Sequence, residues 1–167
     1  NPIEEVLPTL LARLQLTAVR DQLDSLFDEA ARRELNMREA LNFLCQAEGA
    51  RREQRRLQMA VRLAKFPFAR PLDGCDFQAQ PSLDPQQVRE LALCRWVAHG
   101  DDLRRLGPPG VGKTHLAVAL GGAAIQHGYS VLFTPATALV AHLAKAPADG
   151  RLEERLTHWA KPKLLIV

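Results

Sequence analysis

The chain has 167 residues, a formal net charge of +3 and a sequence pI of about 9.0, and 47% of its residues are hydrophobic and 25% charged. This composition is typical of a soluble globular protein that is long enough for one domain and a small accessory domain. No apolar run reaches the roughly 18 residues that a membrane-spanning helix requires, and no signal peptide is recognised, so we expect a cytoplasmic protein without membrane contact. The mild basicity permits an acidic partner such as nucleic acid but does not require one.

Cysteines and histidines give no sign of a metal site. Three cysteines, an odd number without the spacing of metal ligands, are expected to be buried free thiols in a reducing compartment: Cys45, Cys75 and Cys94. Four histidines also lack metal-like spacing and are expected at the surface: His99, His127, His142 and His158.

The N-terminal part of the chain is predicted to be helical. Apolar residues recur at near-helical spacing over residues 2–16, where Pro8 interrupts the pattern, and again over residues 17–35. We therefore expect a small all-α domain over residues 1–66.

The last helix of this domain begins with a recognisable signal and becomes strongly basic. Asn36 and Glu39 form the sequence signature of a capping box, which predicts a helix that runs to about Lys65. Its second half carries a row of arginines: Arg51, Arg52, Arg55, Arg56 and Arg62. Such a row can neutralise several phosphates and bind DNA without sequence preference, but it is equally consistent with a solvated helix face.

A connector rich in proline and glycine follows, and it separates the helical domain from a second domain. It spans residues 67–84, and the second domain spans residues 85–167. Asp84 is expected to cap a new helix that has Pro85 at its first position and runs to Gly100. At the start of the connector, Phe66 and Phe68 are expected either to dock on the second domain or to stack on nucleic-acid bases.

The second domain alternates strands and helices. The predicted order is a strand over 103–106, a helix over 113–127, a strand over 129–134, helices over 136–145 and 151–160, and a final strand over 163–167. This order predicts an α/β fold with a parallel sheet, of the P-loop NTPase type.

The segment between the first strand and the first helix of this domain fits the pattern G-x-x-x-x-G-K-[ST] without a mismatch. Its residues are Gly107, Pro108, Pro109, Gly110, Val111, Gly112, Lys113 and Thr114. The glycines let the backbone turn so that its amides, together with the positive end of the next helix, surround a phosphate chain. The alternative is an ordinary Gly-Pro turn before a helix that happens to carry Lys-Thr.

Three side chains of this pattern have expected roles if it binds ATP. Lys113 would place its ammonium on the outer phosphates and is the candidate catalytic residue, and Thr114 would offer its hydroxyl to Mg²⁺. His115 would either contact the nucleotide or pack in the first turn of the helix.

The loop, with "THLAVALG" after it and "GYSVLFT" further on, resembles the ATPase module of the IstB-like transposition helper proteins, relatives of the DnaC-type helicase loaders in the AAA+ class. The stretches "PIEEVLPTLLARLQL", "FPFARPLDGCDFQAQPSLD" and "LALCRWVAHGD" are similar to the N-terminal region and linker of that family. The resemblance implies an ATP-binding accessory protein that assembles as a homo-oligomer on double-stranded DNA and assists a transposase. A DnaC-like helicase loader and a non-hydrolysing DNA-binding module with a vestigial ATPase half are the alternatives.

The chain departs from the family pattern in two places. "DDLRRLG" stands where the family has an apolar strand, and Arg104 and Arg105 would be costly in a strand buried on both faces. The chain also ends where the family continues with the acidic pair of the Walker B motif, and the arginine finger would follow later. The resemblance therefore predicts half of an ATPase core, with a gap in the sheet between residues 103–106 and the final strand, and hydrolysis by this chain is not expected.

Overall fold

The computed structural model describes residues 2–68, 83–145 and 150–167, with side chains described from residue 5 onward. Contacts divide the chain into two compact units, Asn1–Arg56 and Leu57–Val167. The division falls within one helix, α4 (Met37–Ala64). The domain limits expected at residues 66 and 84 stay a prediction, since most of the connector, residues 69–82, lies outside the described part.

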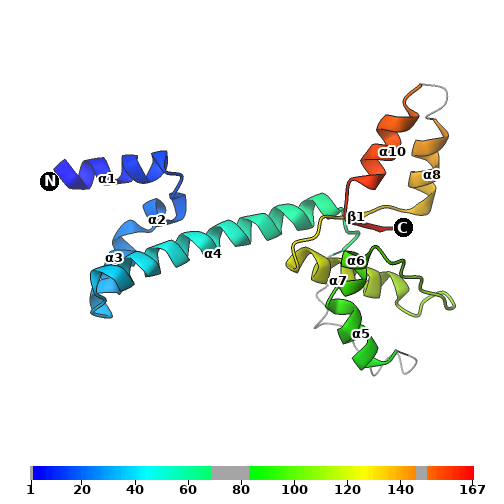
Figure 1. Ribbon diagram of the computed structural model, residues 1–167, viewed down its shortest axis with the longest axis horizontal. Coiled ribbons are helices and arrows are strands. Elements are labelled where there is room, and N and C mark those ends of the chain that lie inside the picture. Colours follow the sequence, from blue (N-terminus) through cyan, green and yellow to red (C-terminus); the bar gives the residue numbers. More distant parts are fainter. Residues whose placement is uncertain (1, 69–82, 146–149) are drawn as a thin grey trace. The chain divides into compact units, whose positions relative to one another are not determined.

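The first unit is built from short helices followed by the first part of α4 (Figure 1). The short helices are α1 (Pro2–Arg13), α2 (Thr17–Asp21) and α3 (Leu23–Arg32). Each contributes one buried residue to a common apolar cluster, namely Leu11, Val19 and Leu26. The expectation of helical structure in this part of the chain is therefore confirmed.

Two details expected for these helices are wrong. α1 continues through Pro8, although a proline inside a helix removes one backbone donor and crowds the preceding turn. The helix expected over residues 17–35 is divided at Gln22, whose φ of −123° is not helical. The division separates α2 from α3, and the first turn of α2 is held by a side chain of α4.

That side chain is Glu48, which is only 4% exposed. Its Oε2 accepts hydrogen bonds from the amides of Ala18 at 2.8 Å and Val19 at 3.2 Å, and its Oε1 accepts one from Arg52 Nε at 3.1 Å. α2 has no side-chain cap at its own N-terminus, so Glu48 satisfies amides that would otherwise lack a partner. Burial acts to raise the pKa of Glu48, but the hydrogen bonds from Val19, Arg52 and Ala18 outweigh it and lower the pKa below 4.5.

The start of α4 has the predicted capping box. The Glu39 amide donates to Asn36 Oδ1, and the Asn36 amide donates to a Glu39 carboxylate oxygen, both at 3.0 Å. Two amides that precede the first intrahelical bonds are thereby satisfied, which fixes where the helix begins.

The second unit opens with a helix that is capped as expected and then broken. Asp84 accepts a hydrogen bond from the Gln86 amide at 2.9 Å, and α5 spans Pro85–Ala92. The single helix expected up to Gly100 is interrupted at Cys94, which has a left-handed φ of 56°, and α6 (Arg95–His99) follows. The break buries Cys94 and lets the Trp96 indole donate to the Leu91 carbonyl at 2.8 Å.

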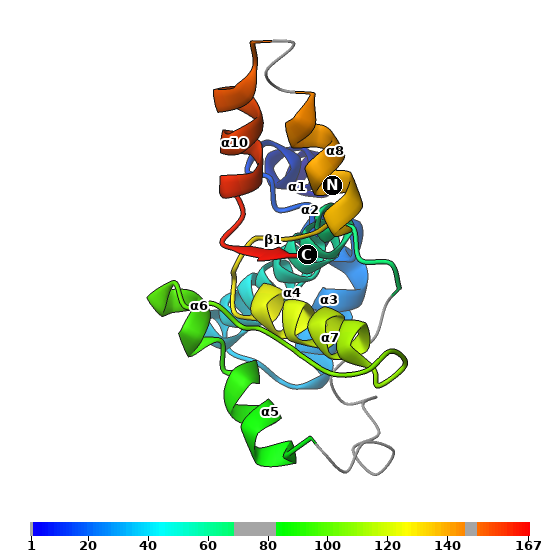
Figure 2. The ribbon, with the colours of Figure 1, turned by 90° about the vertical axis from the view of Figure 1, so that its right-hand side faces the viewer.

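The core of the second unit is one helix against a small parallel sheet. β1 (Val131–Phe133) pairs with β2 (Leu164–Ile166) so that Val131 lies opposite Leu164, which confirms the predicted parallel direction. α7 (Lys113–Gln126) contacts both strands, and it is apolar and buried over most of its length (Figure 1). Two helices, α8 (Ala136–Ala144) and α10 (Leu152–Ala160), come between β1 and β2 along the chain. They lie side by side (Figures 1 and 2).

A glycine in α7 permits the closest approach in this core. A Cβ added to Gly121 would lie 2.8 Å from Ile166 Cδ1 of β2 and 2.8 Å from Phe66 Cζ. Phe66 follows α4 and packs on the same cluster as Ala64, which is fully buried. The absence of a side chain at Gly121 therefore lets both Ile166 of β2 and Phe66 rest on α7.

The strand predicted over residues 103–106 is not formed, and residues 101–108 have no regular structure. The two arginines explain this difference. The Arg104 side chain is 85% exposed and lies 3.9 Å from Asp102, while Arg105 is half-buried and donates to the carbonyl oxygen of Lys113. Neither guanidinium lies in an apolar sheet, as its desolvation cost requires.

The cysteines differ in burial. Cys94 is buried and its burial raises the pKa of the thiol, as expected for an inert cysteine, whereas the expectation of burial is wrong for Cys45, which is exposed on α4. Cys75 lies outside the described residues. Among the helices of the described ranges, none combines the length and the apolar character needed to cross a bilayer.

Candidate nucleotide-binding site

The residues of the Gly-rich pattern form an exposed loop that leads into α7. Gly110 and Gly112 adopt left-handed φ angles of 84° and 79°, and Gly112 is the residue directly before α7. Residues with a side chain rarely adopt this backbone conformation, so the pattern has glycine at the positions where the turn of the loop requires it. The loop thus reverses the chain direction within a few residues and ends at the positive pole of a 14-residue helix.

Lys113 closes this loop with its side chain. Its Nζ donates to the carbonyl oxygens of Gly107 at 2.8 Å and Pro108 at 2.7 Å. The ammonium of Lys113 therefore folds back onto the loop that precedes it and lies on the side where the Gly107 and Pro108 carbonyls point. Thr114 and His115, the next two residues, are exposed.

The first turn of α7 provides amide donors next to this ammonium. The first hydrogen bond at the beginning of the helix is made by the Leu116 amide to the Gly112 carbonyl at 3.0 Å. The amides of the three preceding residues, 113–115, have no carbonyl of the helix to bind. Free amides, a helix dipole and an ammonium at one place are suited to bind an anionic phosphate chain.

Arg105 supports the loop from behind. Its guanidinium donates to the Lys113 carbonyl oxygen, and partial burial lowers the pKa of the guanidinium. Arg105, which would be costly in a buried strand, therefore holds the backbone of Lys113, the candidate phosphate-binding residue.

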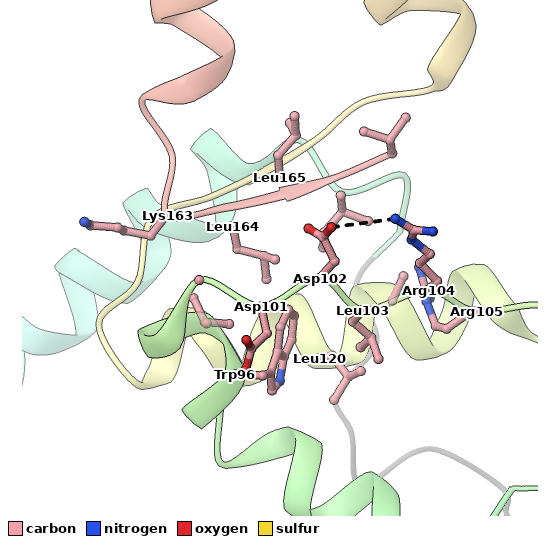
Figure 3. Close-up of a pocket in the computed structure, with 15 residues that line it drawn as sticks. Trp96, Asp101, Asp102, Leu103, Arg104, Arg105, Leu120, Lys163, Leu164 and Leu165 are labelled. Atoms are coloured by element: carbon pink, nitrogen blue, oxygen red, sulfur yellow. Dashed lines mark ion pairs between the residues drawn. The ribbon is translucent and has the colours of Figure 1, made fainter.

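A cavity of about 510 Å³ lies between residues 100–105 and β2 (Figure 3). Its lining includes apolar side chains, among them Trp96, Leu103 and Leu120, and charged ones, among them Asp101 and Arg105 (Figure 3). It lies where the sequence predicts a gap between residues 103–106 and the final strand. The described residues form a sheet of β1 and β2 alone, so no strand of the described part occupies this position.

The five arginines of α4 are all exposed, but three of them have partners close by. Arg52 binds Glu48 and also donates to the Gln15 carbonyl at 2.9 Å, and Arg55 donates to the Thr17 hydroxyl at 3.2 Å. Arg56 makes two hydrogen bonds to Glu53, which raise the pKa of the guanidinium. Arg51 and Arg62 have no hydrogen-bond or ion-pair partner among the described residues.

One contact beside the loop has no counterpart in the sequence patterns. The rings of Phe68 and His115 are stacked, with 4.5 Å between their centroids and 30° between their planes. Phe66 also docks on α7, so both phenylalanines lie on the second unit, as one of the two expectations held. Phe68 lies outside every periodic pattern, and no spacing in the sequence connects it with His115.

The described part of the chain contains no group of three or more metal-ligating side chains. Of the histidines expected at the surface, His142 is half-buried, because its Nδ1 accepts a hydrogen bond from the Trp159 indole at 2.9 Å. This pair joins α8 to α10, and the His142 ring also meets the His158 ring edge to face, with 6.0 Å between their centroids.

The chain matches the family model described as IstB-like ATP binding protein over residues 9–167. Similar proteins are encoded by insertion sequences: the IS21 protein of Pseudomonas aeruginosa is 41% identical over 96% of the chain, and the IS5376 protein of Geobacillus stearothermophilus is 36% identical over 93%. The IS232 protein of Bacillus thuringiensis is also 36% identical, over 96% of the chain. The names of all three refer to ATP binding, and the chain spans 61%, 62% and 64% of their respective lengths.

Proposed function

Because the chain belongs to the family of IstB-like ATP binding proteins, we propose that it is an ATP-binding accessory protein of DNA transposition. ATP would bind at residues 107–114 and at His115. In the presence of ATP, the protein would assemble on double-stranded DNA as a homo-oligomer and assist a transposase. The insertion-sequence origin of the relatives supports this role over that of a replicative helicase loader.

The observation that carries the proposal is the position of the Lys113 ammonium. It lies 2.8 Å and 2.7 Å from two loop carbonyls, directly before amides of the first turn that have no helical partner. An ammonium on a flexible stem can exchange these neutral carbonyls for phosphate oxygens, which are stronger acceptors. Lys113 would then hold the outer phosphates, and the amides of residues 113–115 would hold the chain of phosphates from the other side.

The residues present also fit a magnesium ion that accompanies ATP. Thr114 is exposed at the first turn of α7, and its hydroxyl has no partner among the described residues. A threonine hydroxyl next to bound phosphates is a hard oxygen ligand of the kind that Mg²⁺ prefers. Mg²⁺ would neutralise phosphate charge that Lys113 alone leaves uncompensated.

DNA contact is assigned to the arginine row of α4, which comprises Arg51, Arg52, Arg55, Arg56 and Arg62. Arg51 and Arg62 are the first candidates, since they have no competing partner in the described part of the chain. Arg52, Arg55 and Arg56 would have to give up or share intramolecular bonds to reach a phosphate. The row supports sequence-independent binding by charge, which agrees with an accessory role in which another protein selects the reaction.

Replacement of Lys113 tests the proposal directly. In a calorimetric titration with ATP and Mg²⁺, Lys113→Ala should weaken binding at least a hundredfold, while Lys145→Ala, which changes a lysine that follows α8, should bind as the wild type does. Circular dichroism of both variants controls for folding. Equal affinity of wild type and Lys113→Ala would refute nucleotide binding at this loop.

The DNA part of the proposal has a separate readout. Fluorescence anisotropy of a labelled duplex should rise with wild-type protein in the presence of ATP and should remain lower without ATP or with Lys113→Ala. Binding that is indifferent to ATP and to Lys113 would favour the alternative of a DNA-binding module with a vestigial nucleotide site.

A further inference from the structure

An aromatic pair lies beside the loop, at the point where the connector after α4 meets α7. Phe68 is half-buried and His115 is exposed, and their rings are stacked at a centroid distance of 4.5 Å. His115 directly follows Thr114, so one member of the pair belongs to the first turn of α7 and the other comes from more than forty residues earlier in the chain.

The position of Phe68 is fixed by its neighbour. Phe66, two residues earlier, packs into the core, and its ring lies so close to Gly121 that an added Cβ would come within 2.8 Å of it. The segment of Phe66 and Phe68 thereby contacts α7 at Gly121 and at His115, which are about 1.7 helical turns apart. Phe68 is thus placed over His115 by its partly buried neighbour Phe66.

The pair is not needed as part of the core. His115 is exposed, and neither ring belongs to the buried clusters of the second unit. Two aromatic rings that remain accessible next to a phosphate-binding loop offer flat, polarisable faces to a further flat group. The bases of nucleic acids and nucleotides are such groups, and they stack on aromatic side chains.

The direction of a bound phosphate chain would bring a base to this pair. Lys113 lies over the carbonyls of Gly107 and Pro108, on the side of the loop that would hold the outer phosphates. The amide of His115 is the last of the first-turn amides without a helical partner, so the phosphate nearest the sugar would lie there. The sugar and base must then leave past the side chain of His115.

We propose that Phe68 and His115 form a stacking platform for the base of a bound nucleoside triphosphate. The inference rests on the proposed function and deepens it, since it assigns a base-binding subsite to a residue that lies 39 positions before the loop. Stacking depends on the area of the base, so this platform favours purines over pyrimidines. It presents faces and not a set of hydrogen-bond partners, so by itself it does not distinguish adenine from guanine.

Inorganic tripolyphosphate separates the platform from the phosphate site. The experiment measures dissociation constants of ATP and of tripolyphosphate, both with Mg²⁺, for the full chain and for Phe68→Ala. We expect Phe68→Ala to weaken the binding of ATP about fivefold to thirtyfold, in line with the loss of one stacked base, and to leave the affinity for tripolyphosphate unchanged. His115→Ala should also weaken ATP binding, and both substitutions should reduce the affinity for CTP less than the affinity for ATP.

Two further variants make the result specific. Phe68→Tyr keeps an aromatic face and should retain the affinity for ATP, whereas Phe68→Leu keeps apolar volume without that face and should behave like Phe68→Ala. Phe27→Ala, which removes a phenylalanine that is 44% exposed on α3, is the matched control and should change neither ligand.

The outcomes distinguish this inference from the proposed function. The platform is refuted, and the phosphate site stands, if Phe68→Ala changes the affinities for ATP and tripolyphosphate equally or changes neither. The same conclusion follows if Phe68→Leu binds ATP as tightly as the wild type does. If the wild type binds neither ATP nor tripolyphosphate, the proposed function fails, and the platform fails with it.

Discussion

In the Gly-rich loop, a lysine binds carbonyls that lie five and six residues before it, whereas in the arginine row the partners of two side chains lie far away in sequence. Arg52 reaches the Gln15 carbonyl across 37 residues, and Arg55 reaches the Thr17 hydroxyl across 38. The positive charge of the loop is thus organised by its own short stretch of chain. The charges of Arg52 and Arg55 are organised by how the helices of the first unit pack.

The two regions differ in whether the sequence pattern alone determines where the charged side chains lie. A motif whose geometry is closed within eight residues carries its own structural context, so its side chains lie where the spacing requires. A row of like charges on a helix has no such closure. Whether its members are available to a ligand depends on partners such as Glu48 that the pattern does not contain.

The largest effect is expected at Glu48, which organises the first unit. Glu48→Ala removes the acceptor of two amides of α2 and the partner of Arg52, and it should lower the free energy of unfolding by about 3 kcal/mol. Glu48→Gln keeps one oxygen for the amides but places an amide group toward Arg52, so it should cost less. Urea unfolding gives the free energies, and hydrogen exchange at Ala18 and Val19 localises the loss to this unit.

The same residue predicts a pH dependence. The pKa of Glu48 is lowered on folding from 4.5, so its stabilisation is fully present above that pH and is lost as the pH falls through the folded-state pKa. The stability difference between wild type and Glu48→Gln should therefore shrink below about pH 4.5. Glu53→Gln, which alters an exposed pair with Arg56, is the control and should leave the stability profile nearly unchanged. A constant difference down to pH 3 would contradict the role of the Glu48 charge.

The outcome of the sequence predictions follows the same division between local and long-range signals. The capping box at Asn36, the Asp84 cap, the loop and the parallel direction of the strands depend on local spacing or on chain order, and all of them were predictable. The breaks at Gln22 and Cys94 were not, because they depend on a carboxylate from α4 and on the burial of a cysteine and a tryptophan contact.

The candidate site shows the same limit. The spacing of glycines and Lys113 predicts the loop, but no spacing connects Phe68 or Arg105 with it. Both residues reach the first turn of α7 through the tertiary fold, one by stacking on His115 and the other by a bond to the Lys113 carbonyl. The sequence indicates that Arg105 would be costly in a buried strand, and the strand over residues 103–106 is indeed not formed. The sequence did not indicate that Arg105 contacts the Lys113 carbonyl.

An intermediate effect is expected in the core of the second unit, where Gly121 and Gly122 form a matched pair on α7. An added Cβ at Gly121 would lie within 2.8 Å of Phe66 and Ile166, whereas one at Gly122 would meet nothing within 4 Å. Gly122→Ala should gain up to about 1 kcal/mol from helix propensity. Gly121→Ala carries the same gain but must displace a ring, and it should be about 1–3 kcal/mol less stable than Gly122→Ala.

Thermal unfolding of the two alanine variants checks this difference. Equal melting temperatures would mean that Phe66 does not rest on α7 in solution, and the anchor that places Phe68 over His115 would be absent as well. The two glycine variants therefore test a packing contact of the second unit, as the Glu48 variants test one of the first unit.

The smallest effect is expected in the arginine row, where the measurable quantity is the salt dependence of DNA binding. Removal of one arginine that contacts a phosphate should reduce the slope of log K against log salt by about 1, so Arg51→Ala and Arg62→Ala should each flatten it by that amount. Arg52→Ala should change the slope less, because that guanidinium is bound to Glu48 and Gln15 and its loss acts on the first unit instead.

Anisotropy titrations of one duplex at several salt concentrations, with ATP present, give the slopes. Arg52→Ala should in addition unfold at lower urea, since it leaves the carboxylate of Glu48 buried without its charged partner. If Arg52→Ala flattens the slope as much as Arg51→Ala and leaves stability intact, the intramolecular pair does not compete with DNA. The row would then act as the uniform basic face that its sequence pattern alone describes.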